Sequence, residues 1–358
     1  MQRARGVTFA RLLRAYATSS KAETSASNAK PGLRAIDIAN RLRKEKEDLK
    51  NSEKRVPMTP LQARVDELKQ FSQRLQNIHP CVLTKALYKS RLYEDQNIIA
   101  VNKPYGVPLH SVNGIRNSIA GCLPMLAKVT NDMQPGALLQ FCHTLEKDTT
   151  GVLIIAKTNE AVEHVQTHIR SRQMEVKYLA VTVGVPVPSE GVIDIPIIEK
   201  EVPGPKPLFK MALSPLFKVN EAGDGVTRVR GQRQSQNAVT HYRVLNSTAG
   251  CSLVELQPVT GVKNQLRVHM AFALSCPILG DHKYSDWNKL APQRLPQGTL
   301  QRLGLEQSKT RYLPLHVHCK SIILPGFKGH HDIELSCPPP KYFTRSMKRL
   351  NIVQLKNE

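Results

Sequence analysis

A polar loop at residues 143–151 carries side chains that could take part in catalysis. It reads His-Thr-Leu-Glu-Lys-Asp-Thr-Thr-Gly, so His143, Glu146 and Asp148 fall within six positions. An apolar run at 152–156 follows directly and predicts a buried strand. A loop anchored on such a strand holds its side chains in place while leaving them accessible to a substrate. Residues 143–151 are therefore a candidate active-site loop, although the loop alone does not identify a reaction.

Four more motifs surround this loop in the sequence. They are Asn102-Lys103-Pro104 with Gly106, Lys177-Tyr178-Leu179-Ala180, the run Thr-Gly-Val-Lys-Asn-Gln-Leu-Arg-Val-His at 260–269, and the run from Pro277 to Tyr284. Together with the loop, they resemble the motifs of the RluA-like RNA pseudouridine synthases in both order and spacing. The resemblance covers about residues 98–284 and implies the pseudouridine synthase fold.

The resemblance also implies a reaction and the residues that carry it. Such enzymes isomerise uridine to pseudouridine by breaking the N1–C1′ bond, turning the uracil and joining C5 to C1′, without a cofactor or metal. By position, Glu146 is the catalytic carboxylate, Tyr178 packs on the uracil, and Arg267 pairs with the carboxylate. A carboxylate suits the task because it can stabilise positive charge at C1′, attack C1′ or accept a proton from the ribose. The uridine has to be flipped into a pocket that excludes water.

Six more residues of these motifs are expected to bind the RNA substrate. They are Lys103, His143, Thr144, Thr150, Gln265 and His269. For His143 an alternative role is equally open, because its imidazole could fix the loop by hydrogen bonding.

Two positions depart from the family pattern. Thr144 stands where the family has arginine, and Glu146 stands where it has aspartate. Glutamate keeps the charge but adds one methylene, a shift on the order of 1.5 Å. A misplacement of about 1 Å can cost roughly a hundredfold in rate. Asp148 is a conceivable substitute, although it lies two positions further on and need not face the same pocket.

These departures leave other functions open. A non-catalytic RNA-binding or mitochondrial ribosome-assembly factor would keep the synthase fold and its basic cleft. A glycosidase that uses Glu146 and Asp148 would need both carboxyl groups to flank one bond, with a water pocket between them. The motif around Arg267 argues against the glycosidase.

The first thirty residues predict a mitochondrial presequence. Arg3, Arg5, Arg11 and Arg14 alternate with apolar residues, and no acidic residue precedes Glu23. This pattern is typical of an amphipathic targeting segment, and the Arg-Ala-Tyr-Ala run at 14–17 resembles a matrix-peptidase cleavage site. We expect import into the mitochondrial matrix, with a disordered basic tail as the alternative.

The charge of the chain indicates a polyanionic partner. The formal net charge is +22, and the chain stays strongly basic without its first thirty residues. Lys and Arg that neutralise phosphates release counterions and supply affinity for nucleic acid. The expected partner is mitochondrial rRNA, tRNA or mRNA, and proteins of the mitochondrial ribosome or of RNA granules are further candidates. No apolar run approaches the roughly 20 residues of a membrane span.

The cysteines predict neither disulfides nor a metal site. The chain has seven, widely spread and without a C-x-x-C pair. His316, His318 and Cys319 lie close together, but the alternation in Leu-His-Val-His at 315–318 suits one face of a strand. No second ligand pair at metal spacing accompanies them.

Strand patterns dominate the rest of the chain and predict an α+β fold on a mixed, largely antiparallel sheet, with helices and loops around an active-site cleft. The expected strands lie at 98–101, 152–157, 178–183, 192–197, 239–245, 253–258 and 315–324. Helical periodicity covers 160–172 and 265–274.

The domain organisation follows from changes in composition. Residues 31–80 are charged and helix-prone and predict an N-terminal extension. The catalytic domain is expected at 81–345 and a short tail at 346–358. Within the domain, 199–236 has poor periodicity with several prolines and glycines, which indicates an insertion that projects from the sheet. Its Arg228, Arg230 and Arg233 could contact phosphate or could belong to a solvated loop.

Overall fold

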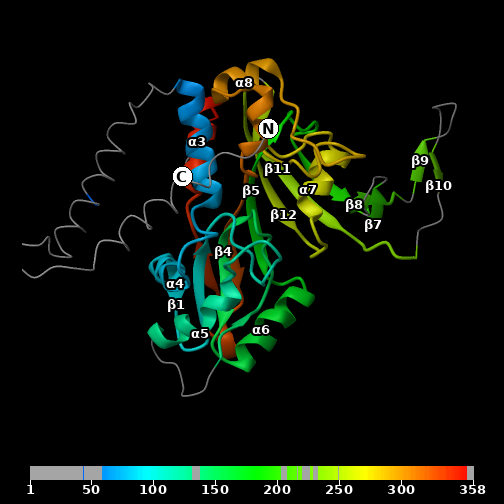
Figure 1. Ribbon diagram of the computed structural model, residues 1–358. Helices are drawn as coiled ribbons and strands as arrows, with labels where there is room; N and C mark the ends of the chain where they lie inside the picture. Colours follow the sequence, from blue (N-terminus) through cyan, green and yellow to red (C-terminus); the bar gives the residue numbers. More distant parts are fainter. Residues whose placement is uncertain are drawn as a thin grey trace, which may run out of the picture. The chain divides into compact units, whose positions relative to one another are not determined.

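The computed structural model describes Arg43 and residues 59–130, 138–202, 208–215, 217–219, 226–228, 233–248 and 250–352 (Figure 1). Apart from Arg43, these residues belong to one compact unit that spans Met58–Glu358. The expected presequence at 1–30 and almost all of the extension before residue 59 lie outside the described residues, as do Arg230 and residues 353–358.

Ten strands of the described chain form one sheet with helices packed around it, which confirms the expected fold class. Neighbouring strands are antiparallel, except that β4 and β13 run parallel. At the side of this path, β3 (Gln140–Phe141) pairs with β4 and β14 (Ile333–Ser336) with β13. The sheet order is β1 (Arg91–Glu94), β2 (Ile98–Lys103), β4 (Thr150–Ala156), β13 (Val317–Leu324), β5 (Glu175–Val183), β12 (Cys251–Pro258), β11 (Val239–Thr248) and β6 (Glu190–Asp194).

The strand β4 lies in the larger part of the core, directly after the candidate active-site loop. All seven of its residues are buried, as expected for an apolar strand that is covered on both faces. Three helices pack around this half of the sheet, namely α4 (Pro80–Lys89), α5 (Ile119–Val129) and α6 (Asn159–Arg170) (Figure 1). The loop therefore ends on a rigid support.

Glycine is required where β4 and β13 meet. Gly151 has φ of 118°, a conformation that L side chains rarely adopt. A Cβ at this position would lie 2.1 Å from the carbonyl oxygen of Cys319 on β13. Cys319 pairs in turn with Tyr178 on β5. This close approach thus sets the spacing between the loop at 143–151 and Tyr178.

The other half of the sheet packs against α3 (Pro60–Gln73), α8 (Gln297–Leu303) and α9 (Lys341–Arg349). Val65 and Leu68 of α3 share a buried cluster with Leu303 and Phe343. The helix α3 starts in a capping box, in which Thr59 and Gln62 satisfy each other's backbone N–H groups. Helices α3 and α9 therefore pack into the same compact unit as the sheet, which spans Met58–Glu358.

The expected insertion at 199–236 contains regular structure that its composition did not predict. Strands β7 (Ile197–Val202) and β8 (Leu208–Leu213) form a separate antiparallel ladder, and β9 (Phe217–Val219) pairs with β10 (Val226–Arg228) in another. Ile197 and Met211 pack against Val268 and Tyr284. The first ladder therefore supports the segment that carries Arg267.

The helix expected at 265–274 forms in two parts. Residues Gln265–Val268 are α-helical (α7), whereas His269–Ala273 form a π-helical turn. Such turns are rare and occur frequently at functional sites. The helix is preceded by Asn264 in a left-handed conformation with φ of 57°.

Candidate active site

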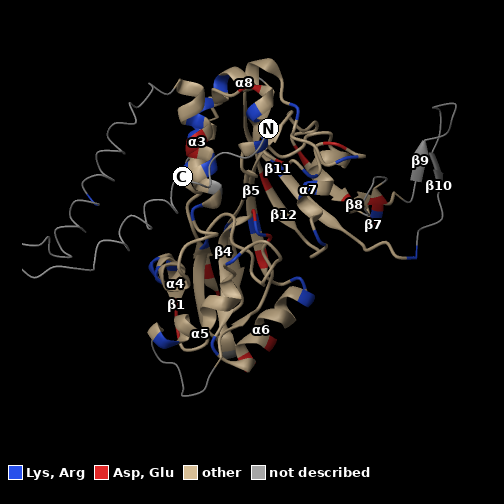
Figure 2. Ribbon diagram, viewed as in Figure 1, with Lys and Arg blue, Asp and Glu red and all other residues tan. Residues whose placement is uncertain are grey.

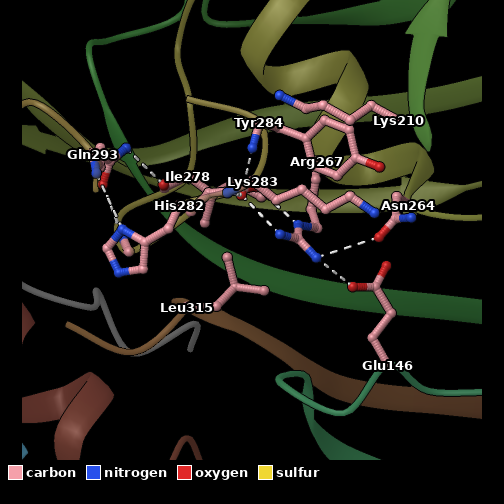
Figure 3. A network of polar contacts seen from close by, with 12 residues as sticks. Glu146, Lys210, Asn264, Arg267, Ile278, His282, Lys283, Tyr284, Gln293 and Leu315 are labelled. Atoms are coloured by element: carbon pink, nitrogen blue, oxygen red, sulfur yellow. Dashed lines mark hydrogen bonds and ion pairs between the residues drawn. The ribbon is translucent and has the colours of Figure 1, made fainter. Parts of the chain in front are cut away.

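Glu146, Arg267 and Asp281 form a chain of ion pairs, and Figure 3 shows Glu146 beside Arg267. The Nη1 atom of Arg267 donates to Oε2 of Glu146 at 2.7 Å, while its Nε and Nη2 donate to the two oxygens of Asp281, both at 2.8 Å. The side chains are 35%, 12% and 1% exposed for Glu146, Arg267 and Asp281. Arg267 is thus fixed from its buried side and presents one donor to an accessible carboxylate.

The Asp281 carboxylate is stabilised inside the protein by the donors that surround it. The backbone N–H groups of Lys283 and Tyr284 donate to it at 3.0 and 2.9 Å. Burial acts to raise the pKa of Asp281, but Arg267 and these two N–H groups outweigh burial and lower it. The Arg267 guanidinium also lies 5.0 Å from the centre of the Tyr284 ring, a cation–π distance.

The position of Arg267 depends on segments that are far apart in the sequence. Burial acts against its charge, but Asp281 and Glu146 outweigh burial and raise the pKa of Arg267. A fourth contact comes from Asn264, whose Oδ1 accepts from Nη1 at 3.3 Å (Figure 3). The planar guanidinium can satisfy these partners at once because its donors form a rigid fork.

A cavity of about 770 Å³ opens beside the Glu146–Arg267 pair. Its size lies within the usual range for small-ligand sites. Tyr178 lines the cavity together with both members of the pair. Burial, together with nearby Cys319 and Glu146, raises the pKa of Tyr178 far above its ordinary value, so its hydroxyl remains a neutral donor. The cavity therefore combines an accessible carboxylate, a fixed guanidinium and an aromatic ring.

Comparison with known proteins identifies the family. Residues 97–272 match the family model described as RNA pseudouridylate synthase. Over 352 residues, the chain is 70% identical to a Danio rerio protein named Pseudouridylate synthase RPUSD4, mitochondrial, and the match covers 98% of each chain. This chain belongs to the RNA pseudouridylate synthase family.

A human relative and a solved human structure extend the comparison. The Homo sapiens protein named Pseudouridylate synthase RPUSD4, mitochondrial is 46% identical over 340 residues, which is 95% of this chain and 89% of the relative. A solved structure of Human RNA Pseudouridylate Synthase Domain Containing 4 matches with a TM-score of 0.68 and 47% identity. That match covers 76% of this chain and 97% of the solved chain, so the synthase fold is shared over almost all of the known structure.

The synthase motifs place the three expected catalytic residues around one cavity, but most of the expected RNA-binding residues have protein partners instead. Thr144 is exposed and lines the cavity. Gln265 also lines it, yet its side chain bonds to the N–H of Val262 at 3.1 Å and to the hydroxyl of Thr260 at 2.8 Å. We therefore assign Gln265 to holding the loop at 260–264.

Two more of these expected RNA-binding side chains are directed into the protein. The imidazole of His269 is buried and bonds to the hydroxyl of Thr240 at 2.9 Å and to the carbonyl of Ile195 at 3.0 Å. Thr150 is buried and lies 2.9 Å from Nδ1 of His318. Neither residue is among those that line the cavity, and both side chains bond to other parts of the protein.

His143 makes the kind of loop-fixing hydrogen bond that the sequence left open as an alternative. Its Nε2 accepts from the backbone N–H of Ile154 at 2.9 Å, which ties the start of the loop to β4. Burial lowers the pKa of His143 to about 4, so the ring is neutral and can accept this bond at physiological pH. Asp148, the conceivable substitute carboxylate, is absent from the residues that line the cavity within the described chain.

Lys103, also expected to contact RNA, instead holds the backbone of the loop at 143–151. Its side chain is completely buried, and Nζ donates to the carbonyl oxygens of Lys147 at 3.0 Å and Thr149 at 2.8 Å. A third, longer contact reaches Pro104 at 3.3 Å. Burial lowers the pKa of Lys103 to about 7, although Asp148 and Glu146 oppose this shift. Lys103 is thus a positioning residue for the segment around Glu146.

We expect Lys103→Met to destabilise the protein by about 2 kcal/mol, since buried carbonyl oxygens lose a donor. Activity should fall about tenfold because the loop loosens. The folded pKa of about 7 lies below the ordinary 10.5, so the unfolded chain binds a proton in this window and the folded chain does not. Native stability should therefore rise between pH 7 and 10 relative to the variant. Urea unfolding at several pH values measures the stability of both proteins. The same dependence of stability on pH in the native protein and the variant would contradict the prediction.

The sequence motifs contained Asp281 without revealing its role. Asp281 lies in the run from Pro277 to Tyr284, but nothing in the spacing showed that it pairs with Arg267. Lys283 of the same run lines the cavity as well.

Among the described residues, no group of three or more His, Cys, Asp or Glu could hold a metal ion. No helix in the described part of the chain is long and apolar enough to cross a membrane.

Proposed function

We propose that this protein isomerises uridine to pseudouridine in mitochondrial RNA. Its family membership supports the reaction, and its relatives are named mitochondrial. The basic, acid-free pattern of the first residues supports import into the matrix. Ribosomal, transfer and messenger RNA are all candidate substrates. A human relative 30% identical to this chain is named Mitochondrial mRNA pseudouridine synthase RPUSD3.

The reaction needs no external reactant. The N1–C1′ bond of the uridine breaks, the uracil turns within the pocket, C5 bonds to C1′, and the hydrogen from C5 is replaced by one on N1. Glu146 supplies the carboxylate at C1′, where it stabilises positive charge, attacks the carbon or accepts a ribose proton. Tyr178 packs against the uracil and keeps it in the pocket.

The observation that carries the proposal is the contact between Glu146 and Arg267 at the cavity wall. Their 2.7 Å distance shows that the longer glutamate side chain reaches the guanidinium from this loop. Because Asp281 already neutralises one side of Arg267, the guanidinium is held still while Glu146 stays one-third exposed. A fixed guanidinium beside an accessible carboxylate is a preorganised electrostatic site.

The departures at Thr144 and Glu146 favour a second candidate, a non-catalytic RNA-binding or mitochondrial ribosome-assembly factor. Threonine cannot replace the donor fork of the family's arginine, since it has a single hydroxyl. In this role the cavity would hold RNA without reaction. Proteins of the mitochondrial ribosome or of RNA granules would then be its partners.

Pseudouridine formation on mitochondrial RNA separates the two candidates. Purified protein is incubated with RNA from mitochondria that lack it, and new pseudouridines are mapped by carbodiimide probing. We expect new sites with the native chain and none with Glu146→Gln. Binding of the same RNA without any new site, in parallel with activity of Glu146→Asp, would support the binding factor and contradict the enzyme.

A further inference from the structure

A second cavity of about 680 Å³ adjoins the active-site cavity. Five residues line both cavities, namely Thr144, Tyr178, Pro258, Thr260 and Gly261. Most of the other residues in the second wall come from the end of α6, the turn after it and the start of β5. The others are Cys142, His143, Gln257 and Val259. A strand of RNA whose uridine occupies the first cavity can therefore continue into the second past Thr144 and Tyr178.

The wall of this second cavity suits a nucleotide. Exposed Arg170 and Arg172 lie at the α6 end, where Figure 2 shows basic residues. The one carboxylate in the wall, Glu175, is paired with Lys177 at 2.6 Å. Amide groups and apolar side chains also line the cavity, from Gln166, Gln173, Gln257, Ile169, Met174 and Val176. The cavity thus offers guanidinium groups for phosphate beside neutral surface for a base or ribose.

The backbone of Arg172 gives a second and independent indication. Arg172 has φ of 59°, and the helix α6 ends there in a Schellman motif. Its N–H donates to Ile169 at 3.2 Å, and the N–H of Gln173 donates to His168 at 2.9 Å. Glycine is the favoured residue at this position because it has no Cβ. An arginine here keeps an unfavourable backbone conformation and supplies a guanidinium to the cavity.

We propose that the second cavity binds a nucleotide next to the target uridine, with its phosphate held by Arg170 and Arg172. The inference rests on the proposed function, because it assumes that a uridine occupies the first cavity. Its volume is sufficient for one nucleotide. Each phosphate contact releases counterions, so this site adds salt-dependent affinity for the RNA strand without reading its sequence.

Replacing Arg172 with glycine tests the inference without harming the fold. The change removes the guanidinium but relieves the backbone, so thermal stability should stay equal or rise. The matched control is Asn351→Gly, because Asn351 has φ of 58° and ends α9 in the same hydrogen-bonding pattern, with Ile352 bonded to Met347 at 2.9 Å. Asn351 is not among the residues that line either cavity in the described chain.

Fluorescence anisotropy with labelled oligouridine, over a range of salt concentrations, measures the effect. We expect Arg172→Gly and Arg170→Ala each to weaken binding roughly 5- to 10-fold, and the slope of log affinity against log salt to fall by about 0.7 per lost phosphate contact. Arg172→Lys should keep part of the affinity and part of the salt slope that Arg172→Gly loses. Asn351→Gly should bind as the native protein does. The KM for mitochondrial RNA should rise in the arginine variants while kcat changes little.

The outcomes separate this inference from the proposed function. The inference is overturned if Arg172→Gly and Arg170→Ala both keep the affinity, the salt slope and the KM of the native protein. This holds even if pseudouridine formation is normal. If the native chain forms no pseudouridine and Arg172→Gly still loses affinity and salt dependence, the cavity is an RNA site and the proposed function is wrong.

Discussion

Glu146→Gln should slow pseudouridine formation by about a thousandfold or more, while the dissociation constant for RNA stays within about threefold of the native value. Glutamine has the shape of glutamate, and its carbonyl oxygen can still accept from Nη1 of Arg267, which now bonds to Glu146 at 2.7 Å. The amide cannot stabilise positive charge at C1′, attack it or accept a proton as a carboxylate does. The loss should therefore fall on kcat rather than on binding.

Single-turnover assays with saturating enzyme measure this change directly. Thr149→Ser is a suitable control, since Thr149 belongs to the same loop and its backbone carbonyl, rather than its side chain, bonds to Lys103. It should retain most of the native rate. Activity of Glu146→Gln near the native value would show that the carboxylate is dispensable and would remove the chemical basis of the proposed mechanism.

The companion variant Glu146→Asp tests whether the backbone of the loop places glutamate, rather than the shorter aspartate, at the correct distance from Arg267. Shortening the side chain by one methylene withdraws the carboxylate on the order of 1.5 Å from Arg267. The pair at 2.7 Å would open, and we expect a loss of about 10- to 100-fold in rate. A faster Glu146→Asp enzyme would instead mean that the backbone is set for aspartate and that glutamate limits the native chain.

Local patterns were sufficient for most of the sheet. The apolar run expected at 152–157 is β4 (Thr150–Ala156), and the helix expected at 160–172 is α6 (Asn159–Arg170). Both have a strong periodicity, and α6 has the capping residue Thr158, which accepts from the N–H of Ala161. These properties depend on neighbours in the sequence, which explains why they can be recognised without the fold.

Tertiary contacts determined what the sequence did not predict. The π-helical turn at His269–Ala273 begins two residues after Arg267, and other elements hold both Arg267 and His269. The ladder of β7 and β8 lies in a segment of poor periodicity and gains its stability from packing against Val268 and Tyr284. Neither set of partners is adjacent in the sequence.

The same limit applies to the site. Family motifs located Glu146 and Arg267, which lie 121 positions apart in the chain and 2.7 Å apart in space. The motifs did not separate residues that face the cavity from those that support it. Lys103, Thr150 and His269 all have hydrogen-bonding groups, but only the fold shows that these groups bond to protein. A residue type defines what a group can bond to, and burial determines the partner.

Asp281→Asn is expected to destabilise the protein by about 3–5 kcal/mol, because it leaves the buried side of Arg267 without a compensating charge. Asn has one acceptor oxygen, whereas the carboxylate accepts from Nε and Nη2 of Arg267 and from the N–H groups of Lys283 and Tyr284. The NH2 group of the asparagine would face some of these donors and could not accept a hydrogen bond from them. Urea unfolding at neutral pH measures the loss.

The matched control is Asp286→Asn, in the loop that follows Asp281. Asp286 has a 36% exposed side chain and a distant ion pair with Lys289 at 3.9 Å. Exposed pairs contribute little, so we expect a change of at most about 1 kcal/mol. Similar losses for both variants would mean that the burial of Asp281 has no particular energetic importance.

The effect of Asp281→Asn should depend on pH in a defined direction. Arg267 and two backbone N–H groups lower the pKa of Asp281 below its ordinary 3.8 despite burial. The stabilisation is therefore present above about pH 4 and is lost as the pH falls through the folded pKa. The difference in unfolding free energy between the native chain and the variant should shrink below pH 4.

Above pH 4, Asp281→Asn should also lower the rate of pseudouridine formation by about a hundredfold, because Arg267 is no longer held in position beside Glu146.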